Sequence, residues 1–385
     1  MAKLGEVCLI NPKSCTLRDD TEVSFIPMTK VGEHGEFDAS EIKNYSEVKK
    51  GFTNFQNGDI LFAKITPCME NGKGAIAHNM KNGIGFGSTE FHVLRPDTDK
   101  ITSEWLYYLT TWETFRKEAE RNMTGSAGQK RVPKTFLENY VVNLPDIDTQ
   151  KSENKILRKV DDLIFLRKQQ LAKLDELVKA RFVEMFGTFP ANPFRWSTGK
   201  IQDVVSDVRY GSSRPAVEGG KYPYLRMNNI TYSGKLDLHD TKRIDIPDSE
   251  LDKCTVRRGD VLFNRTNSKE LVGKTCVYNR DELMVLAGFI IRVRVNERIR
   301  PEVLSAFLNM DFSKRMLIGM CKTAIGQANI NAKELQNIDL YIPPIELQDQ
   351  FVALKNKIDQ QKQTVQQSLE KLELLKKALM QEYFG

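Results

Sequence analysis

Hydrophobic and polar residues follow two different patterns along the chain. Up to about residue 150, short apolar runs such as "VSFIPM", "DILFA" and "FHVLRP" are separated by Gly, Asn and Pro, which is typical of strands joined by loops. The segment "SEWLYYLTTWETFRKEAE" predicts one or two helices within this part. From residue 151 to residue 186 the pattern changes to a charged segment without Gly or Pro. That segment predicts one long helix.

Apolar residues recur every seven positions in this segment and again at the end of the chain. In the first helix they are Leu157, Val160, Leu163, Ile164, Leu171, Leu174, Leu177 and Val178, and in the second Phe351, Leu354, Ile358, Val365, Leu372, Leu375 and Leu379. Both segments stop at a glycine, Gly187 or Gly385, as helices often do. Such a narrow seam favours contact with another helix.

The length of the two helices favours pairing between them. A helix of about 35 residues is about 50 Å long, which exceeds what one domain of this size can cover. We therefore expect the two helices to pair antiparallel. The alternative is that each helix packs only on its own globular domain.

Sequence motifs of the first half of the chain recur in the second half. "GDILF" at Gly58 reappears as "GDVLF" at Gly259, 201 positions downstream. "GSAGQKRVPKTFLENYVVNLP" matches "TAIGQANINAKELQNIDLYIP" at an offset of 198, which aligns Gly128-Gln129 with Gly326-Gln327. "KLGEV" near the start resembles "KIQDV". We interpret these matches as an internal duplication, with a shared framework strand and a shared framework turn at the Gly-Gln pair.

The duplication predicts an α+β chain of four segments. They are a globular domain over residues 1–150, a long helix over 151–187, a second globular domain over 188–346 and a second long helix over 347–385. The globular segments are then two copies of one α/β domain, separated by an antiparallel coiled coil.

Length, charge and cysteine content favour a multidomain protein with an anionic partner and reduced thiols. The 385 residues are enough for two or three domains, and the net charge of +6 with a pI near 8.8 mildly favours an anionic partner such as nucleic acid. The six cysteines form no C-x-x-C pair, so we expect reduced thiols and a cytoplasmic protein. The first residues predict no signal peptide, and no window predicts a membrane span.

Basic and amide side chains cluster in loops near the repeated strand. Arg suits guanine and Asn or Gln suits adenine in the major groove of DNA, so these loops are candidate DNA contacts. The candidates are Lys64, Thr66, Asn71, Lys73, Lys130 and Arg131 in the first half, and Arg209, Tyr210, Ser212, Arg214, Asn264, Arg265, Asn267, Lys269 and Lys274 in the second. Any one of them alone is equally well explained as a solvated loop side chain.

Catalytic motifs fit this sequence poorly. An adenine methyltransferase would need Asn or Asp before Pro-Pro and an aromatic residue after it, but Ile342 and Ile345 flank Pro343-Pro344. The chain has no P-loop, and its four histidines lack metal-ligand spacing. The triplet Glu41-Ile42-Lys43 with nearby Asp38 could suggest a magnesium nuclease, but such triplets are common by chance. We therefore predict a protein that is not an enzyme.

Longer segments resemble a known family. "YPYLRMNNI", then "GDVLFNRTNSKELVGKTCVY", then "GQANINAKELQNIDLYIPPIELQDQ" and a terminal coiled-coil helix resemble the specificity subunit of type I restriction-modification systems, and the similarity runs over essentially the whole chain. The first half departs from the second in reading "NLPDIDTQ" in place of "YIPPIELQ", so Gln150 matches Gln348 while Asp146 replaces Pro344. It also lacks a counterpart of Trp196.

The resemblance implies two target recognition domains that each read one half of a bipartite, asymmetric site in double-stranded DNA. It implies that the helices act as a spacer and as the docking site for two modification subunits, which methylate adenine with S-adenosylmethionine. A restriction and translocase subunit would join with ATP and Mg²⁺, and this chain itself would bind no cofactor. The alternative is a repeat-built protein scaffold without DNA readout, against which the Arg- and Asn-rich loops argue.

Overall fold

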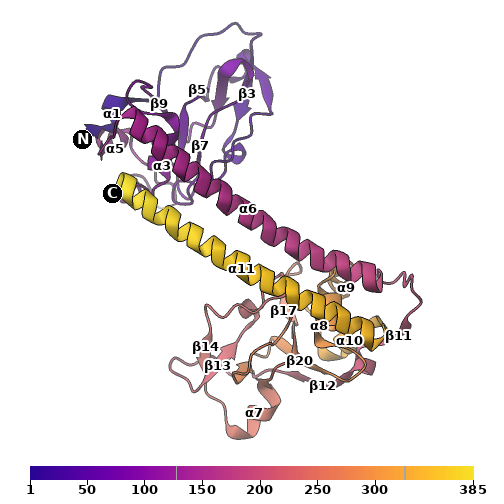
Figure 1. Cartoon of the computed structure of the whole chain (residues 1–385). Coiled ribbons are helices and arrows are strands. Elements are labelled where there is room, and N and C mark those ends of the chain that lie inside the picture. The colour runs from indigo at the N-terminus through magenta and orange to yellow at the C-terminus, as the bar shows by residue number, and fades with distance from the viewer. Residues whose placement is uncertain (127, 325–326) are drawn as a thin grey trace. The chain divides into compact units, whose positions relative to one another are not determined.

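Two long helices, α6 (Ile147–Phe186) and α11 (Ile345–Phe384), each follow a domain of short strands and helices in this computed structural model (Figure 1). The structure describes residues 1–126, 128–324 and 327–385. The chain divides into two units, the first made of Met1–Leu166 with Ser368–Gly385 and the second of Arg167–Gln367. Each unit therefore contains one globular domain and one half of each long helix.

The first unit contains two four-stranded sheets. One has the order β2-β9-β6-β7 and is antiparallel throughout, and the other has the order β4-β3-β8-β5, in which only β3 and β8 are parallel. The strands are β2 (Cys8–Ile10), β3 (Glu22–Ile26), β4 (Ile42–Asn44), β5 (Thr53–Gln56), β6 (Ile60–Ala63), β7 (Gly74–Ile76), β8 (Ile84–Gly87) and β9 (Phe91–Pro96). The helices outside the pair are α1 (Leu4–Val7), α2 (Tyr45–Val48), α3 (Ser103–Thr111), α4 (Glu113–Arg121) and α5 (Lys134–Asn139), and β1 (Ala2–Lys3) pairs with β10 (Val141–Val142).

The second unit repeats the two four-stranded sheets strand for strand and adds a three-stranded sheet of order β17-β22-β21. Its sheets have the orders β12-β20-β16-β18 and β14-β13-β19-β15, again with one parallel pair, β13 and β19. The strands are β12 (Val205–Tyr210), β13 (Tyr222–Leu225), β14 (Lys242–Ile244), β15 (Thr255–Val256), β16 (Val261–Asn264), β18 (Thr275–Val277), β19 (Met284–Leu286) and β20 (Ile290–Val295). The helices are α7 (Asp248–Cys254), α8 (Pro301–Asn309), α9 (Asp311–Met320) and α10 (Ala332–Gln336), and β11 (Ser197–Lys200) pairs with β23 (Asp339–Ile342). The predicted duplication is therefore present in the strand order itself.

The repeated Gly-Asp motif builds the turn that starts the framework strand. Gly58 has a φ of 92°, a conformation that favours glycine. The Asp59 carboxylate accepts a hydrogen bond from the Gln56 backbone N–H at 2.8 Å and forms a two-pronged ion pair with Arg95 of β9. The second unit has the same arrangement at Gly259, Asp260, Arg257 and Arg294.

A buried glutamine fixes the start of each long helix. Gln150 is fully buried, and its side-chain amide accepts a hydrogen bond from the Thr102 backbone N–H at 2.9 Å and donates to the Lys100 and Pro145 carbonyls. Gln348 does the same in the second unit with Arg300, Arg298 and Pro343. The match between Gln150 and Gln348 in the sequence therefore marks a shared anchor between helix and domain.

The two long helices run antiparallel within each unit. In the first unit Lys376 of α11 forms an ion pair with Asp161 of α6 at 2.6 Å. In the second unit Lys362 of α11 pairs with Asp175 of α6, and Phe351 packs edge-on against Phe186 with ring centroids 5.4 Å apart. In the second unit, residue 175 of α6 meets residue 362 of α11 and residue 186 meets residue 351, so residue numbers rise along one helix as they fall along the other. The predicted antiparallel coiled coil is therefore confirmed.

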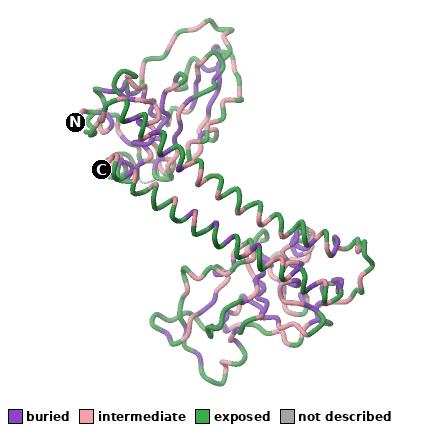
Figure 2. Tube along the Cα trace, in the orientation of Figure 1, coloured by how far each residue is buried: buried purple, intermediate pink, exposed green. Residues whose placement is uncertain are grey.

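The helix ends also pack on the globular domains. Leu157 of α6 and Met380 of α11 join the core of the first domain, while Phe186 of α6 and Phe351 of α11 join that of the second. The buried positions of α6 lie near its two ends, whereas those of α11 continue through the middle of the helix (Figure 2). The two helices therefore pair with each other, and each also packs on the cores of both domains, so the alternative that each helix packs only on its own domain is wrong.

Details of the helices differ from the sequence prediction. The helices begin at Ile147 and Ile345, a few residues before the predicted starts at residues 151 and 347. Leu177 and Leu375 were expected on the apolar seam but are 39% and 46% exposed. Within the described part of the chain, no helix combines the length and apolar character that a membrane span requires.

Candidate nucleic-acid interface

The strongest candidates lie in the loops that follow the two framework strands. Residues 64–73 connect β6 to β7, and residues 265–274 connect β16 to β18. Lys64 and Arg265 are equivalent first residues of these loops, 201 positions apart. The backbone of Lys64 is held between Glu90 and Val132, and that of Arg265 between Phe289 and Ile330, through matching hydrogen bonds of 2.9–3.0 Å. Both side chains are half-buried where they leave the framework.

The first unit brings its two predicted loops together. Thr66 donates through its backbone N–H to the Lys130 carbonyl at 3.1 Å and through its hydroxyl to the same oxygen at 3.4 Å. Isolated bridges join Arg131 to Ile65 and to Thr124. Residues 64–73 therefore share one surface with residues 124–126 and 128–131, although Thr66 and Lys130 are 64 positions apart in the sequence.

Charge on this first surface is partly neutralised. Arg131 forms a two-pronged ion pair with Glu90 at 2.8 and 2.9 Å, and this guanidinium lowers the pKa of the Glu90 carboxyl. Lys130 and Asn71 are exposed. Lys73 is directed back into the domain, where its ammonium donates to the Met28 carbonyl at 3.3 Å.

The second unit assembles a cluster around Arg265. Its guanidinium lies over the Tyr210 ring at 4.6 Å, a favourable cation–π contact. Its Nε donates to the Asn329 side-chain oxygen at 3.2 Å, and the Thr266 hydroxyl donates to the same atom at 3.1 Å. The Tyr210 hydroxyl accepts a hydrogen bond from the Ala332 backbone N–H at 2.8 Å. The pairing of β17 (Thr266–Asn267) with β22 (Gln327–Asn329) carries this cluster.

Sequence reasoning missed Asn329. The available signal was its alignment with Arg131 at the offset of 198. The framework turn expected at Gly128-Gln129 has a left-handed Gly128, with a φ of 81°. Its partner Gly326 lies outside the residues that the structure describes.

The two arginines near β12 are exposed but paired, whereas Ser212 is buried. Arg209 contacts Asp207 at 2.8 Å, and Arg214 forms a two-pronged ion pair with Glu250 that lowers the pKa of the Glu250 carboxyl. Ser212 is 7% exposed, and its hydroxyl accepts a hydrogen bond from the Arg214 backbone N–H at 3.2 Å.

Two candidates of the second loop belong to the framework. Asn264 is fully buried, and Lys274 is 7% exposed with its ammonium 2.9 Å from the Met227 carbonyl. That contact repeats the one between Lys73 and Met28. Asn267 and Lys269 lie further along the same loop, half-buried and exposed respectively. The buried pair is not carried into the DNA-contact proposal, because these side chains do not reach the surface.

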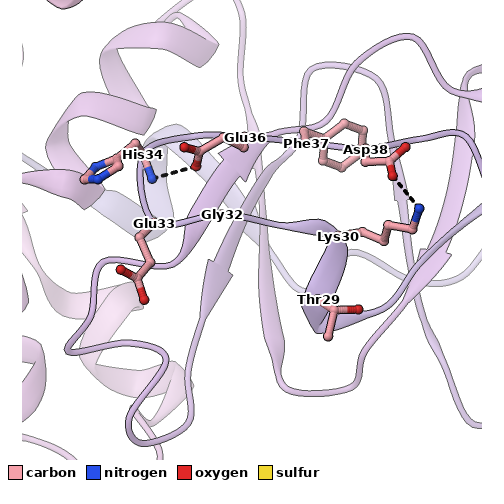
Figure 3. A pocket seen from close by; sticks show the side chains of 8 residues that line it. All are labelled: Thr29, Lys30, Gly32, Glu33, His34, Glu36, Phe37 and Asp38. Carbon is pink, nitrogen blue, oxygen red and sulfur yellow. Dashed lines mark hydrogen bonds and ion pairs between the residues drawn. The ribbon is translucent and has the colours of Figure 1, made fainter. Parts of the chain in front are cut away.

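An acidic hollow of about 480 Å³ lies elsewhere in the first unit, lined by residues 29–38 (Figure 3). The Glu36 carboxylate accepts a hydrogen bond from the His34 backbone N–H at 2.9 Å, and Lys30 pairs with Asp38. The carboxylates of Glu33, Glu36 and Asp38 disfavour a phosphate ligand here.

Two members of the nuclease-like triplet are paired with each other, since Lys43 lies 3.5 Å from the Glu41 carboxylate and also over the Phe25 ring at 3.6 Å. Asp38 is instead engaged by Lys30 and Ser40. Among residues 1–126, 128–324 and 327–385, no group of three or more His, Cys, Asp or Glu side chains is placed to hold a metal ion.

Comparison with known proteins agrees with the duplicated architecture. The family model described as "Type I restriction modification DNA specificity domain" matches twice, over residues 1–176 and 193–374. The specificity subunit of the type I restriction enzyme EcoAI of Escherichia coli is 46% identical over 178 residues, which cover 45% of this chain and 30% of that subunit. The EcoEI specificity subunit of Escherichia coli is 26% identical over 460 residues, covering 91% of this chain and 76% of that one.

Solved structures share the fold. A chain from a study of complex assembly and conformational transition in the type I R-M system matches with a TM-score of 0.61 at 20% identity, over 99% of this chain and 96% of that chain. The type I restriction-modification S subunit from M. genitalium matches with a TM-score of 0.55 at 13% identity, over 100% and 95% of the two chains.

Proposed function

The chain belongs to the type I restriction-modification DNA specificity family, and from this membership we propose that it selects the DNA sequence on which such a system acts. Each globular domain reads one half of a bipartite site in double-stranded DNA. The chain itself transfers no methyl group and cuts no bond. These reactions belong to two modification subunits, which use S-adenosylmethionine, and to restriction and translocase subunits, which use ATP and Mg²⁺.

One observation carries this proposal. The two domains share a framework, yet they present unlike side chains at equivalent loop positions. Lys64, Thr66 and Arg131 in the first domain align with Arg265, Asn267 and Asn329 in the second. Because Arg suits guanine and Asn suits adenine, two such surfaces support an asymmetric target with two different half-sites.

The residues assigned to DNA contact are those that reach the surface. In the first domain they are Lys64, Thr66, Asn71, Lys130 and Arg131, and in the second Arg209, Tyr210, Arg214, Arg265, Asn267 and Lys269. The ion pairs of Arg131, Arg209 and Arg214 exchange a carboxylate for a phosphate when DNA binds. Free thiols at all six cysteines and a DNA substrate support a cytoplasmic location.

Binding to duplex DNA in an ionic-strength series tests DNA readout against the scaffold alternative. We expect the logarithm of the binding constant to fall linearly with that of the salt concentration, with a slope of about −0.9 per phosphate contacted. Lys130→Ala should reduce the slope by about one contact. Lys50→Ala, which removes an exposed lysine outside these loops, should leave the slope unchanged. Binding that is insensitive to salt would support a scaffold for proteins alone.

Division of labour between subunits gives a second test. We expect the purified chain with S-adenosylmethionine, ATP and Mg²⁺ to leave DNA unmodified and uncut, and activity to appear when the partner subunits are added. Mapping the methylated adenines in cells that carry the complete system would then define both half-sites. Methyl transfer by the chain alone would contradict the proposal.

A further inference from the structure

Each domain carries a buried cation on the second helix that follows its last sheet strand. Arg116 of α4 is 8% exposed, and Lys314 of α9 is 9% exposed. They are equivalent by position, 198 residues apart. In the described part of the chain neither one forms an ion pair, and the titratable groups acting on them are Tyr107 for Arg116 and two lysines for Lys314, not carboxylates. Burying such a charge is costly unless hydrogen bonds compensate, so the partners of these two cations are informative.

Both cations bind backbone carbonyls at the end of the loop after the framework strand. The Arg116 guanidinium donates to the Met69 carbonyl at 2.6 Å and to the Gly72 carbonyl at 3.0 Å. The Lys314 ammonium donates to the Gly273 carbonyl at 2.6 Å. Gly72 and Gly273 are themselves equivalent and both left-handed, with φ values of 92° and 77°. The same contact is therefore made in both domains, although the cation differs.

A second cation, a lysine in both domains, attaches each loop to the sheet that contains β3 or β13. The residue after each of these glycines, Lys73 or Lys274, donates to the carbonyl of Met28 or Met227, which opens a short 3-10 turn after β3 or β13. The end of the loop is thus held from the helices on one side and from the second sheet on the other. The candidate DNA contacts lie on the part of the loop between this tether and the framework strand.

Building on the proposed function, we propose that Arg116 and Lys314 are matched positioning residues for DNA readout. Neither touches DNA. Each holds one recognition loop, residues 64–73 or residues 265–274, in the conformation that presents its side chains to the bases. Loss of one tether should therefore relax base discrimination at one half-site only.

The test uses the full chain reconstituted with its modification subunits. Methylation rates are measured on a duplex with the mapped target and on duplexes with one base pair changed in either half. Lys314→Met removes the donor but keeps an apolar side chain of similar length. We expect discrimination at the half-site of the second domain to fall about tenfold, within the range that one base pair contributes. Discrimination at the other half-site should not change.

Matched variants separate positioning from general stability. Arg116→Met should produce the mirror result at the half-site of the first domain. Lys314→Arg keeps a charged donor and should retain discrimination. If Lys314→Met lowers the melting temperature while discrimination at both half-sites stays at the wild-type level, Lys314 is only a structural residue and the inference is wrong. If the wild-type complex itself discriminates at neither half-site, the proposed function fails instead.

A pH series with the wild-type complex decides the matter even if Lys314→Met does not fold. Burial lowers the pKa of Lys314 to about 8, with Lys179 and Lys274 adding to the effect; the Tyr232 ring lies 5.9 Å from the ammonium. Between pH 7 and pH 9 the tether in the second domain should lose its charge, while the Arg116 guanidinium stays mostly charged because its pKa is about 10. Discrimination at the second half-site alone should then fall, and Lys314→Arg should abolish that fall. A flat profile, or an equal fall in Lys314→Arg, would overturn the inference.

Discussion

At the scale of single residues, the duplicated Gly-Asp motif depends on a buried carboxylate. The Asp59 side chain is 1% exposed and paired with Arg95, which is 24% exposed. We expect Asp59→Asn to lower the free energy of unfolding of the first domain by about 3 kcal/mol, because Arg95 loses its ionic partner and the turn loses a strong acceptor. Hydrogen exchange of β6 and β9 under native conditions measures this domain separately. Asp260→Asn should affect the second domain instead.

The control for this prediction is a pair with the same chemistry at the surface. Arg18 and Asp20 are 3.8 Å apart, with side chains 89% and 80% exposed. Asp20→Asn should change stability by less than about 0.5 kcal/mol, because water already solvates both groups. If Asp20→Asn and Asp59→Asn lowered the free energy of unfolding equally, burial of the Gly-Asp motif would not contribute to stability.

The buried side chain of His92 should make the stability of the first domain, but not of the second, sensitive to acid. It is 4% exposed, its Nε2 donates to the Val132 carbonyl at 2.8 Å, and its Nδ1 accepts from the Asn11 amide at 3.0 Å. Burial lowers the pKa of His92 from 6.5, so the unfolded chain takes up a proton before the folded domain does. Stability should therefore be unaffected above pH 6.5 and should fall as the pH drops below it.

Thermal melts between pH 7.5 and pH 5 would measure this effect. The second domain serves as an internal comparison, because β20 has no histidine at the position that matches His92 in β9. His92 faces Phe62 across the first sheet, and Ile291 faces Phe263 at the matching place in the second. We expect His92→Gln to flatten the acid response of the first domain by removing the titrating group. An unchanged response in His92→Gln would assign the acid sensitivity to other groups.

At the scale of elements, the seven-residue pattern predicted two helices and their pairing but not every contact. The buried positions Phe351, Ile358 and Val365 of α11 keep the seven-residue spacing, but the next buried apolar positions, Leu369 and Met380, follow after 4 and 11 residues, closer to 3.6 residues per turn than to a strict heptad. That drift explains why Leu375 is exposed although it fits the heptad. Lys362 was not expected on the seam, because lysine is normally solvated, yet it is 7% exposed.

The Asp175–Lys362 ion pair should fix the register of α6 and α11 within the second unit. Lys362 also lies 3.7 Å from Asp359, so Lys362→Asp places three carboxylates together and should destabilise this unit by about 3 kcal/mol. Adding Asp175→Lys restores opposite charges and should recover at least about 1 kcal/mol. Urea denaturation of the two single variants and the double variant measures this coupling. Equal stabilities of Lys362→Asp and the double variant would show that the contact does not set the register.

At the scale of the whole molecule, the sequence predicted the duplicated plan better than the interface. Repeated motifs such as the Gly-Asp turn and the Gln150–Gln348 match recur at nearly constant spacing, so they reveal the plan directly. The contact between Thr66 and Lys130 forms only in the tertiary fold, and no local sequence pattern predicts it. For the same reason Lys73 and Lys274 were read as loop cations, whereas both reach back to carbonyls of the framework.

If the proposed function holds, the paired helices should act as a ruler between half-sites. Both helices continue through the boundary between the units, at Leu166–Arg167 and at Gln367–Ser368. Seven residues inserted into both helices at these points should add about 10 Å, or about three base pairs at 3.4 Å each. An insertion in one helix alone should damage folding, because the Asp161–Lys376 and Asp175–Lys362 pairs could no longer share one register. Maps of methylated adenine would report the spacing, and an unchanged spacing in the doubly lengthened protein would contradict the ruler.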